Sequence, residues 1–385
     1  MITYGRQSIS QSDIDAVLKV LESDYLTQGP VVPKFEEGLT SKCHAQYAVA
    51  VNSATSALHI ACLALQVGPG DVVWTSPTTF VASANCARYC GASVDFVDID
   101  PDTWCLSPVR LAEKLKLHQD EELPLPKVVI AVHLSGQSCD MESIAALGRQ
   151  YGFKIIEDAS HAIGGLYRDA PVGNCSYSDV TVFSFHPVKI ITTGEGGAAL
   201  TNRVDLYQIM NRLRSHGITR DVELLTCKPP GPWYYEQLDL GYNYRMTDLQ
   251  AALGVSQLTR PEQFVEDRNE LAERYDSLLI DSSFTVQKIP DDVQSSRHLY
   301  VVRVSADRRD AMCERLRDAG IASNLHYLPV HLQPYYRKLG FSDGMFREAE
   351  RYALEAITLP LFPQLTHAGQ DEVIRVLSHC NATAI

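Results

Sequence analysis

The chain has 385 residues, of which 45% are hydrophobic and 21% are charged. This composition is typical of a globular protein with a large core and excludes a mainly disordered chain. Lysine and arginine total 34 against 47 acidic residues, a formal net charge of −13, so nucleic acid and anionic membranes are poor candidate partners. No run approaches the ~18 apolar residues that a membrane span needs.

Neither the N-terminus nor the cysteines indicate secretion. Residues 1–11 lack the basic start and the apolar core of a signal peptide. The ten cysteines are scattered and none forms a C-x-x-C pair, a pattern typical of reduced, buried thiols and unsuited to zinc. We therefore expect a cytoplasmic protein without a bound metal.

The first expected elements are two helices. Ser10 and Asp13 resemble a capping box, and the apolar residues that follow recur at helical spacing: Ile14, Val17, Leu18 and Leu21. A second helix is expected from about Ser53 to the Gly-Pro-Gly stop at 68–70.

Short β-rich runs then alternate with helical patterns as far as residue 201. The expected strands are 72–75, 94–97, 128–133, 154–157, 181–185 and 198–201, and the helices between them include 81–89 and 141–151. Alternation of this kind predicts an α/β fold with a large, mostly parallel sheet and helices on both faces.

The pattern changes after about residue 245, which predicts a large domain over 1–245 and a smaller α+β domain over 246–385. Helices are expected at 246–258, 261–279, 309–319 and 349–357, and a strand at 298–304. The segment 225–233 (LTCKPPGPW) is expected to be a mobile loop, because its prolines forbid regular pairing.

Lys189 is the most distinctive candidate for chemistry. It follows an expected strand in FSFHPVK (183–189) and precedes the glycine-rich TTGEGG (192–197). A lysine at such an edge can point into a cleft, lose its proton among apolar and cationic neighbours, and act as a nucleophile. An exposed lysine before a tight turn is an equally good interpretation of this segment alone.

Two further segments carry candidate ligands. Asp158 ends the apolar strand IIED, where open α/β sheets bind their ligands, although this segment alone favours a helix cap. Ser53, Ala54 and Thr55 stand at an expected helix start, whose free amides suit a phosphate but also fit ordinary capping.

Together these three signals meet the requirements of pyridoxal 5'-phosphate. A lysine can form an imine with its aldehyde, a carboxylate can keep its ring nitrogen protonated, and a helix start can hold its phosphate. Phe80, which follows the turn SPTT at 76–79, supplies an aromatic face for the ring, although core packing would explain it as well.

The order SATSA, SPTTF, EDASHA, SFHPVK, TTGEGG and GYNYRMTD resembles the DegT–DnrJ–StrS family of nucleotide-sugar aminotransferases. The resemblance extends from Tyr4 nearly to the C-terminus without a large gap. It implies a fold type I pyridoxal-phosphate transferase. Relatives that remove a sugar hydroxyl carry histidine at the lysine position, so Lys189 favours transamination.

The resemblance also implies roles for individual residues. Lys189 would be the Schiff-base lysine and the acid–base group, and Asp158 would pair with the ring nitrogen. The remaining cofactor contacts would be Ser53, Ala54, Thr55, Phe80, His161 and Ser184, with Asn243 reaching the phosphate from the neighbouring subunit of a homodimer with shared sites. Many relatives have glutamine at the position of His161.

Four segments look most like one branch of that family: YGRQ (4–7), SHGITR (215–220), PWYYE (232–236) and HYLPVH (326–331). That branch aminates C4 of a UDP-4-keto-sugar on the route to pseudaminic acid, and L-glutamate would be the amino donor. The candidate substrate contacts are Tyr4, Arg6, Arg214, His216, Arg220, Arg245, His326 and His331, since arginine suits a diphosphate.

Several alternatives remain open. The substrate could be the stereoisomeric UDP-keto-sugar or a 3-keto dTDP-sugar, and a non-catalytic binding or regulatory protein could share the fold. A nicotinamide-dependent dehydrogenase fits poorly, because residues 194–199 lack the last glycine of its fingerprint and lead toward a strand.

Overall fold

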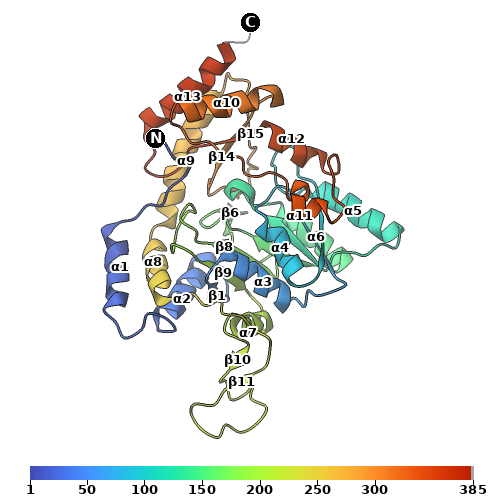
Figure 1. Cartoon of the computed structure of the whole chain (residues 1–385), viewed down its shortest axis with the longest axis vertical. Coiled ribbons are helices and arrows are strands. Elements are labelled where there is room, and N and C mark those ends of the chain that lie inside the picture. The colour runs from blue at the N-terminus through green and yellow to red at the C-terminus, as the bar shows by residue number, and fades with distance from the viewer. Residues whose placement is uncertain (383–385) are drawn as a thin grey trace.

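A central sheet organises the computed structural model, which describes residues 1–382 (Figure 1). Within these residues the sheet has seven strands, in the order β1-β9-β8-β5-β4-β2-β3. The strands are β1 (Tyr47–Val51), β2 (Val72–Thr75), β3 (Ser93–Phe96), β4 (Val128–Val132), β5 (Lys154–Asp158), β8 (Val180–Ser184) and β9 (Gly197–Thr201). Neighbours from β3 to β8 are parallel, whereas β9 is antiparallel to both β8 and β1. The predicted α/β fold class is confirmed.

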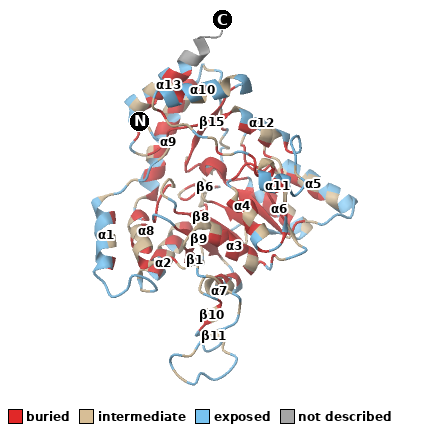
Figure 2. Ribbon diagram, viewed as in Figure 1, coloured by how far each residue is buried: buried red, intermediate tan, exposed pale blue. Residues whose placement is uncertain are grey.

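Helices cover both faces of this sheet, because its side chains alternate between two cores. In β1, Val49 and Val51 belong to one buried cluster, whereas Ala48 and Ala50 belong to the other. The surrounding helices are α1 (Gln11–Leu21), α2 (Val31–Cys43), α3 (Ala54–Ala64), α4 (Ala82–Tyr89), α5 (Pro108–Asp120), α6 (Met141–Tyr151), α7 (Val204–Leu213) and α8 (Asp248–Gln257). Figure 2 shows the buried strands in the middle and the exposed outer helices.

The expected start signals are present. Ser10 and Asp13 form the reciprocal bonds of a capping box at α1, and the Ser53 side chain caps α3. The strand β1 and the helices α2, α5 and α7 were not predicted from the sequence.

A smaller antiparallel sheet, β12-β14-β15, forms the C-terminal part of the molecule. Its strands are β12 (Thr285–Val286), β14 (Tyr300–Arg303) and β15 (Ala356–Leu359), and its helices are α9 (Pro261–Leu279), α10 (Ala306–Asp318), α11 (Pro334–Arg337), α12 (Arg347–Glu355) and α13 (His367–Ala382). The domain division at residue 245 stays a prediction. One helix expected beyond that boundary, α8, packs against α1 and α2.

One expected helix is too long. The helix predicted over 349–357 ends at Glu355, and β15 begins at once. Ile357 and Thr358 are β-branched, buried and paired with β14, so tertiary pairing determines their conformation.

Short strands and loops complete the chain. The pairs are β6 (Leu166–Tyr167) with β7 (Ala170–Pro171) and β13 (Val293–Gln294), and β10 (Ile218–Thr219) with β11 (Glu236–Gln237); two 3-10 turns are η1 (Leu134–Gly136) and η2 (Val330–Leu332). The segment 220–235 between β10 and β11 lacks regular structure and projects from the body beyond α7 (Figure 1); it includes the loop expected over 225–233, whose mobility stays a prediction.

Within the described residues, none of the helices combines the length and the apolar character that a membrane span requires. Nine cysteines have described side chains; none is in a disulfide and seven are buried. Cys380 lies outside the residues whose side chains are described.

Candidate functional site

A cavity of about 610 Å³ lies where the carboxyl ends of the parallel strands meet. Parallel pairing aligns the ends of β2, β4, β5 and β8 at one edge, and the segments that follow each strand supply the walls. The predicted residues on these walls are Tyr4, Ser53, Ala54, Thr55, Phe80, Asp158, His161, Ser184, Lys189 and His326. Residues more than 300 positions apart in the sequence therefore share one cavity.

Lys189 stands in a tight turn after β8. Its backbone N–H donates to the carbonyl of His186 at 2.9 Å, and its side chain is partly buried in the cavity wall. Burial lowers the pKa of the Lys189 amine to about 8, although the Asp158 carboxylate opposes this shift. A substantial fraction of the amine is therefore neutral near physiological pH, as a nucleophile requires. The interpretation as an exposed lysine is wrong.

Asp158 ends β5 and is 6% exposed. Its Oδ2 accepts a hydrogen bond from the Ser83 hydroxyl at 2.6 Å, and its Oδ1 accepts from the hydroxyl of Ser160 at 2.6 Å. No α-helix begins at this point of the described chain, so Asp158 is not a helix cap. Three polar groups instead orient the Asp158 carboxyl group at the cavity edge, since the Ser160 N–H also donates to Oδ1.

The start of α3 lies on the cavity wall, where Ser53, Ala54 and Thr55 line it. Ser53 caps the helix by accepting from the Ser56 N–H at 3.1 Å, whereas the amides of Ala54 and Thr55 lie in the first turn, which has no helical acceptors. A Cβ on Gly197 would lie 2.4 Å from the Ala54 nitrogen, so only glycine allows β9 to approach this closely. The capping interpretation is therefore confirmed, whereas phosphate binding by the amides of Ala54 and Thr55, which line the cavity, stays a prediction.

Phe80 is 58% exposed and lines the cavity. Its ring centroid lies 6.1 Å from that of Tyr327. Core packing therefore does not explain this phenylalanine, and its ring is available to a planar ligand.

His161 lies in a cluster of aromatic rings on the cavity wall. Its Nε2 is 3.1 Å from the Tyr327 hydroxyl, and its ring centroid is 4.4 Å from that of His298. Burial and the nearby Lys189 hold the pKa of His161 well below its ordinary value. Burial and Lys189 also lower the pKa of His326 to about 4. Both imidazoles are thus neutral near physiological pH.

These residues fit pyridoxal phosphate by their chemistry. The cavity combines a partly deprotonated lysine, an oriented carboxylate, free helix-start amides and a buried histidine whose Nδ1 has no partner. Lys189 and Asp158 would hold the aldehyde and the ring nitrogen, and the α3 amides with Ser184 would hold the phosphate.

The candidate substrate residues divide into two groups. Tyr4 and His326 line the cavity, and their ring centroids are 5.3 Å apart. The others do not line the cavity of their own chain: Arg6, Arg214, His216, Arg220, Arg245 and His331. Asn243 is likewise exposed and outside it.

Three members of that second group have partners within the chain. Arg214 bonds to the Glu36 carboxylate and to the carbonyl of Ala50, and Arg245 donates to the Ser215 hydroxyl at 3.1 Å. His331 is fully buried and contacts Glu350 at 3.0 Å. Arg6, His216 and Arg220 are exposed.

The sequence reading missed several residues of the site. Ser83 lies in the helix expected over 81–89, and His298 begins the strand expected over 298–304, but neither was predicted as a site residue. Tyr327 stands inside the quoted HYLPVH segment, where its aromatic side chain between two histidines was an available signal.

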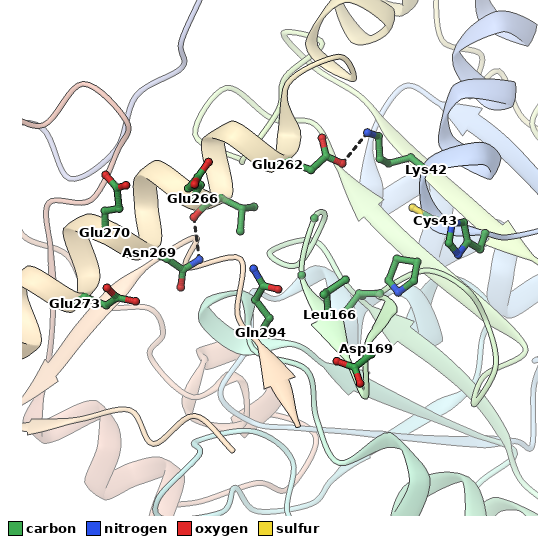
Figure 3. A pocket seen from close by; sticks show the side chains of 16 residues that line it. Lys42, Cys43, Leu166, Asp169, Glu262, Glu266, Asn269, Glu270, Glu273 and Gln294 are labelled. Atoms are coloured by element: carbon green, nitrogen blue, oxygen red, sulfur yellow. Dashed lines mark hydrogen bonds and ion pairs between the residues drawn. The ribbon is translucent and has the colours of Figure 1, made fainter. Parts of the chain in front are cut away.

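A second hollow, here called the α9 groove, has a volume of about 620 Å³. Glu266, Glu270 and Glu273 of α9 line one side, and Lys42 of α2 forms an ion pair with Glu262 at 2.7 Å (Figure 3). Among its described lining residues no lysine stands beside a buried carboxylate, so this groove lacks the chemistry of the cavity.

Comparisons with known proteins identify the family. The model of the DegT/DnrJ/EryC1/StrS aminotransferase family matches residues 7–378. A Campylobacter jejuni protein named UDP-4-amino-4,6-dideoxy-N-acetyl-beta-L-altrosamine transaminase is 37% identical, over 95% of this chain and 93% of that protein.

Two solved structures extend the likeness. Spr1654 from Streptococcus pneumoniae, solved in its PMP form, is 31% identical with a TM-score of 0.90 over 100% of both chains, and a PLP form of it also matches. PseC from Helicobacter pylori, an aminotransferase involved in the biosynthesis of pseudoaminic acid, is 29% identical with a TM-score of 0.89 over 98% of both chains. The chain therefore belongs to the DegT/DnrJ/EryC1/StrS aminotransferase family, and its cofactor is pyridoxal phosphate.

Proposed function

We propose that the protein transfers the amino group of L-glutamate to C4 of UDP-2-acetamido-2,6-dideoxy-β-L-arabino-hex-4-ulose. The products would be UDP-4-amino-4,6-dideoxy-N-acetyl-β-L-altrosamine and 2-oxoglutarate. The choice of sugar is supported by the name of the Campylobacter jejuni relative and by the likeness to PseC.

One observation carries the reaction class. Lys189, with its lowered pKa, shares a cavity with the buried Asp158 and with the free amides at the start of α3. Each of these groups has a separate explanation, but a phosphorylated pyridine aldehyde uses all three at once.

Lys189 is the proposed acid–base group of both half-reactions. When bound, pyridoxal phosphate supplies an electron sink for the carbon that loses its proton. Lys189 is the basic group on the cavity wall with a pKa of about 8, so its Nζ can take the α-proton of the amino donor. In the second half of the reaction the same Nζ returns a proton to C4 of the sugar.

The proposed role of Asp158 is to stabilise the proton on the pyridine nitrogen of the cofactor. Ser83 donates to one of its oxygens and Ser160 to the other, so both oxygens are held in place. Asp158 would pair with the pyridine nitrogen of the cofactor and keep it protonated. Phe80 would pack against the ring, and Ser184 with the α3 amides would bind the phosphate.

The active site is proposed to be shared between two subunits. Asn243 is exposed and does not line the cavity of its own chain, so it would bind the phosphate held by the partner subunit of a homodimer. Tyr4 and His326 would contact the sugar, and the exposed Arg6, His216 and Arg220 are candidates for the diphosphate.

The test is an incubation of the holoenzyme with L-glutamate and each of the two C5-epimeric UDP-4-keto-6-deoxy-N-acetyl sugars, followed by mass and NMR analysis. The proposal expects amination of the L-arabino epimer. Exclusive use of the other epimer would overturn the sugar assignment but keep the reaction class, and a cofactor-bound protein that aminates neither sugar would favour a binding role.

A further inference from the structure

Two hydroxyl groups, those of Thr79 and Ser83, form a hydrogen-bonded chain that ends on the carboxyl group of Asp158. The Thr79 Oγ1 lies 2.7 Å from the Ser83 Oγ, and the Ser83 Oγ donates to the Asp158 Oδ2 at 2.6 Å. Ser83 is fully buried and does not line the cavity, whereas Thr79 and Asp158 do line it. Ser83 can therefore affect a ligand in the cavity through the residues that it holds.

The bond lengths give this chain a direction. A hydroxyl group has one proton to donate and two lone pairs that accept. The short bond to Asp158 uses the proton of Ser83, since the alternative acceptor, the Phe80 carbonyl, is 3.4 Å away. Ser83 is then the acceptor in its contact with Thr79, so Thr79 donates to Ser83 and Ser83 donates to Asp158.

The two oxygens of Asp158 differ in what they have left to accept. Oδ1 accepts both the N–H of Ser160 at 3.2 Å and its O–H at 2.6 Å, which fills the two lone pairs of that oxygen. In the part of the chain that the structure describes, Oδ2 accepts from Ser83 alone. One acceptor site therefore remains on the carboxyl group, and it belongs to the oxygen that Ser83 holds.

We propose that Ser83 is a positioning residue of the reaction. Supported by Thr79, it fixes Asp158 so that the remaining acceptor site of Oδ2 receives the N–H of the cofactor's ring. The role of Asp158 toward that ring rests on the proposed function.

The same turn of chain also places Phe80. The backbone N–H of Ser83 donates to the carbonyl of Phe80 at 3.3 Å, at the start of α4. Ser83 thus bonds through its backbone to the residue proposed to pack on the ring, and through its side chain to the residue proposed to pair with the ring nitrogen.

The first test is a double-mutant cycle on kcat, measured in the holoenzyme with L-glutamate and the UDP-keto-sugar that it accepts. Ser83→Ala should lower kcat about 10-fold and change the KM of L-glutamate by less than about 2-fold, because the serine supports the chemical step without binding substrate. In an Asp158→Asn background, Ser83→Ala should lower kcat hardly further, because the serine acts through that carboxylate. Equal losses in both backgrounds would indicate a merely structural role and overturn the inference.

Thr79→Val tests the far end of the chain, because it removes the hydroxyl group but keeps the branched shape of the side chain. It should lower kcat less than Ser83→Ala does, and it should add nothing in a Ser83→Ala background. Additive losses would contradict the chain.

The matched control is Ser178→Ala on the neighbouring carboxylate of β5. The Ser178 Oγ donates to the Glu157 Oε1 at 2.5 Å, but neither residue lines the cavity. Successive side chains of a strand point to opposite faces of the sheet, so this pair repeats the bond on the other side. Ser178→Ala should change kcat by less than about 2-fold. A loss as large as that of Ser83→Ala would contradict a specific role for Ser83.

A second measurement does not depend on turnover. The ¹⁵N chemical shift of the ring nitrogen of labelled cofactor in the holoenzyme should indicate a protonated ring, move toward the unprotonated value in Ser83→Ala, and stay in place in Ser178→Ala. An unmoved shift in Ser83→Ala would overturn the inference. Movement in the opposite direction would do so too, because Ser83 would then compete with the ring for the carboxylate. A normal kcat in Asp158→Asn would instead contradict the proposed function of Asp158, so the two failures are distinguishable.

Discussion

The cavity at Lys189 and the α9 groove have nearly the same volume, about 610 and 620 Å³, but very different chemistry. In the groove, the Lys42–Glu262 ion pair is open to water, with side-chain exposures of 32% and 64%. In the cavity, Asp158, His161 and His298 are buried, and burial shifts the pKa of both histidines. Convergent buried groups, rather than the size of a hollow, thus distinguish the proposed active site from the groove.

Removing the lysine of each region tests the difference between the two regions with the largest expected effect. Lys189→Ala should lower transamination by about 10²-fold to 10⁴-fold or more, because the acid–base group is lost. Lys42→Ala should leave the rate unchanged. Steady-state assays with L-glutamate and the UDP-keto-sugar measure both, and near-normal turnover of Lys189→Ala would contradict the assignment.

The carboxylate gives the next largest expected effect. Asp158→Asn keeps the shape of the side chain but removes the charge that protonates the ring nitrogen. We expect a fall in kcat of roughly 10²-fold, about 2.7 kcal/mol of transition-state stabilisation. An unchanged kcat with normal folding by circular dichroism would remove Asp158 from this role.

The pH dependence of stability should separate the two regions as well. The cavity histidines His161, His298 and His326 have lowered pKa values, so the folded protein keeps them neutral while the unfolded chain binds protons. Their contribution is fully present above about pH 6.5 and falls by up to about 1.4 kcal/mol per histidine per pH unit below it, until the folded-state pKa is reached, about 4 for His326. Urea unfolding of the apoprotein at several pH values measures this slope. His326→Gln should flatten it, and a slope unchanged by that substitution would argue against the buried neutral ring.

Ser83→Ala tests the support of the carboxylate. It removes the 2.6 Å hydrogen bond to Asp158, and we expect a loss of about 1.5–3 kcal/mol in unfolding free energy. Chemical denaturation checks this, with Ser12→Ala on the exposed surface of α1 as the comparison. Equal stability of the two variants would show that the bond contributes little.

The groove should give the smallest effect. Glu270 is exposed on α9. The substitution Glu270→Gln should therefore change the unfolding free energy by less than about 0.5 kcal/mol. A larger loss would mean that the acidic side chains of the groove do more than face solvent.

The sequence predicted the elements whose signals lie within the element itself. Strand β2 and helix α9 were predicted with correct bounds, because an apolar run and a proline start are local signals. The start of β15 was missed, since Ile357 becomes a strand residue only through its partner Val302 in β14. Domain limits remain a prediction.

The site was predictable where one residue carries its own chemical signal. Lys189, Asp158 and Phe80 were found from their neighbours in the chain, and all three line the cavity. Ser83 and His298 were not predicted. Ser83 bonds to Asp158, which is 75 residues away in the sequence, and His298 lies in the site through its contact with the ring of His161. Such pairings have no local pattern in a single sequence.

The most direct measurement is reduction of the purified holoenzyme with borohydride, followed by digestion and mapping of the labelled peptide. The account predicts a stable cofactor adduct on Lys189, within the segment between β8 and β9. A label on another lysine, such as Lys42 of the α9 groove, or no label at all, would contradict it.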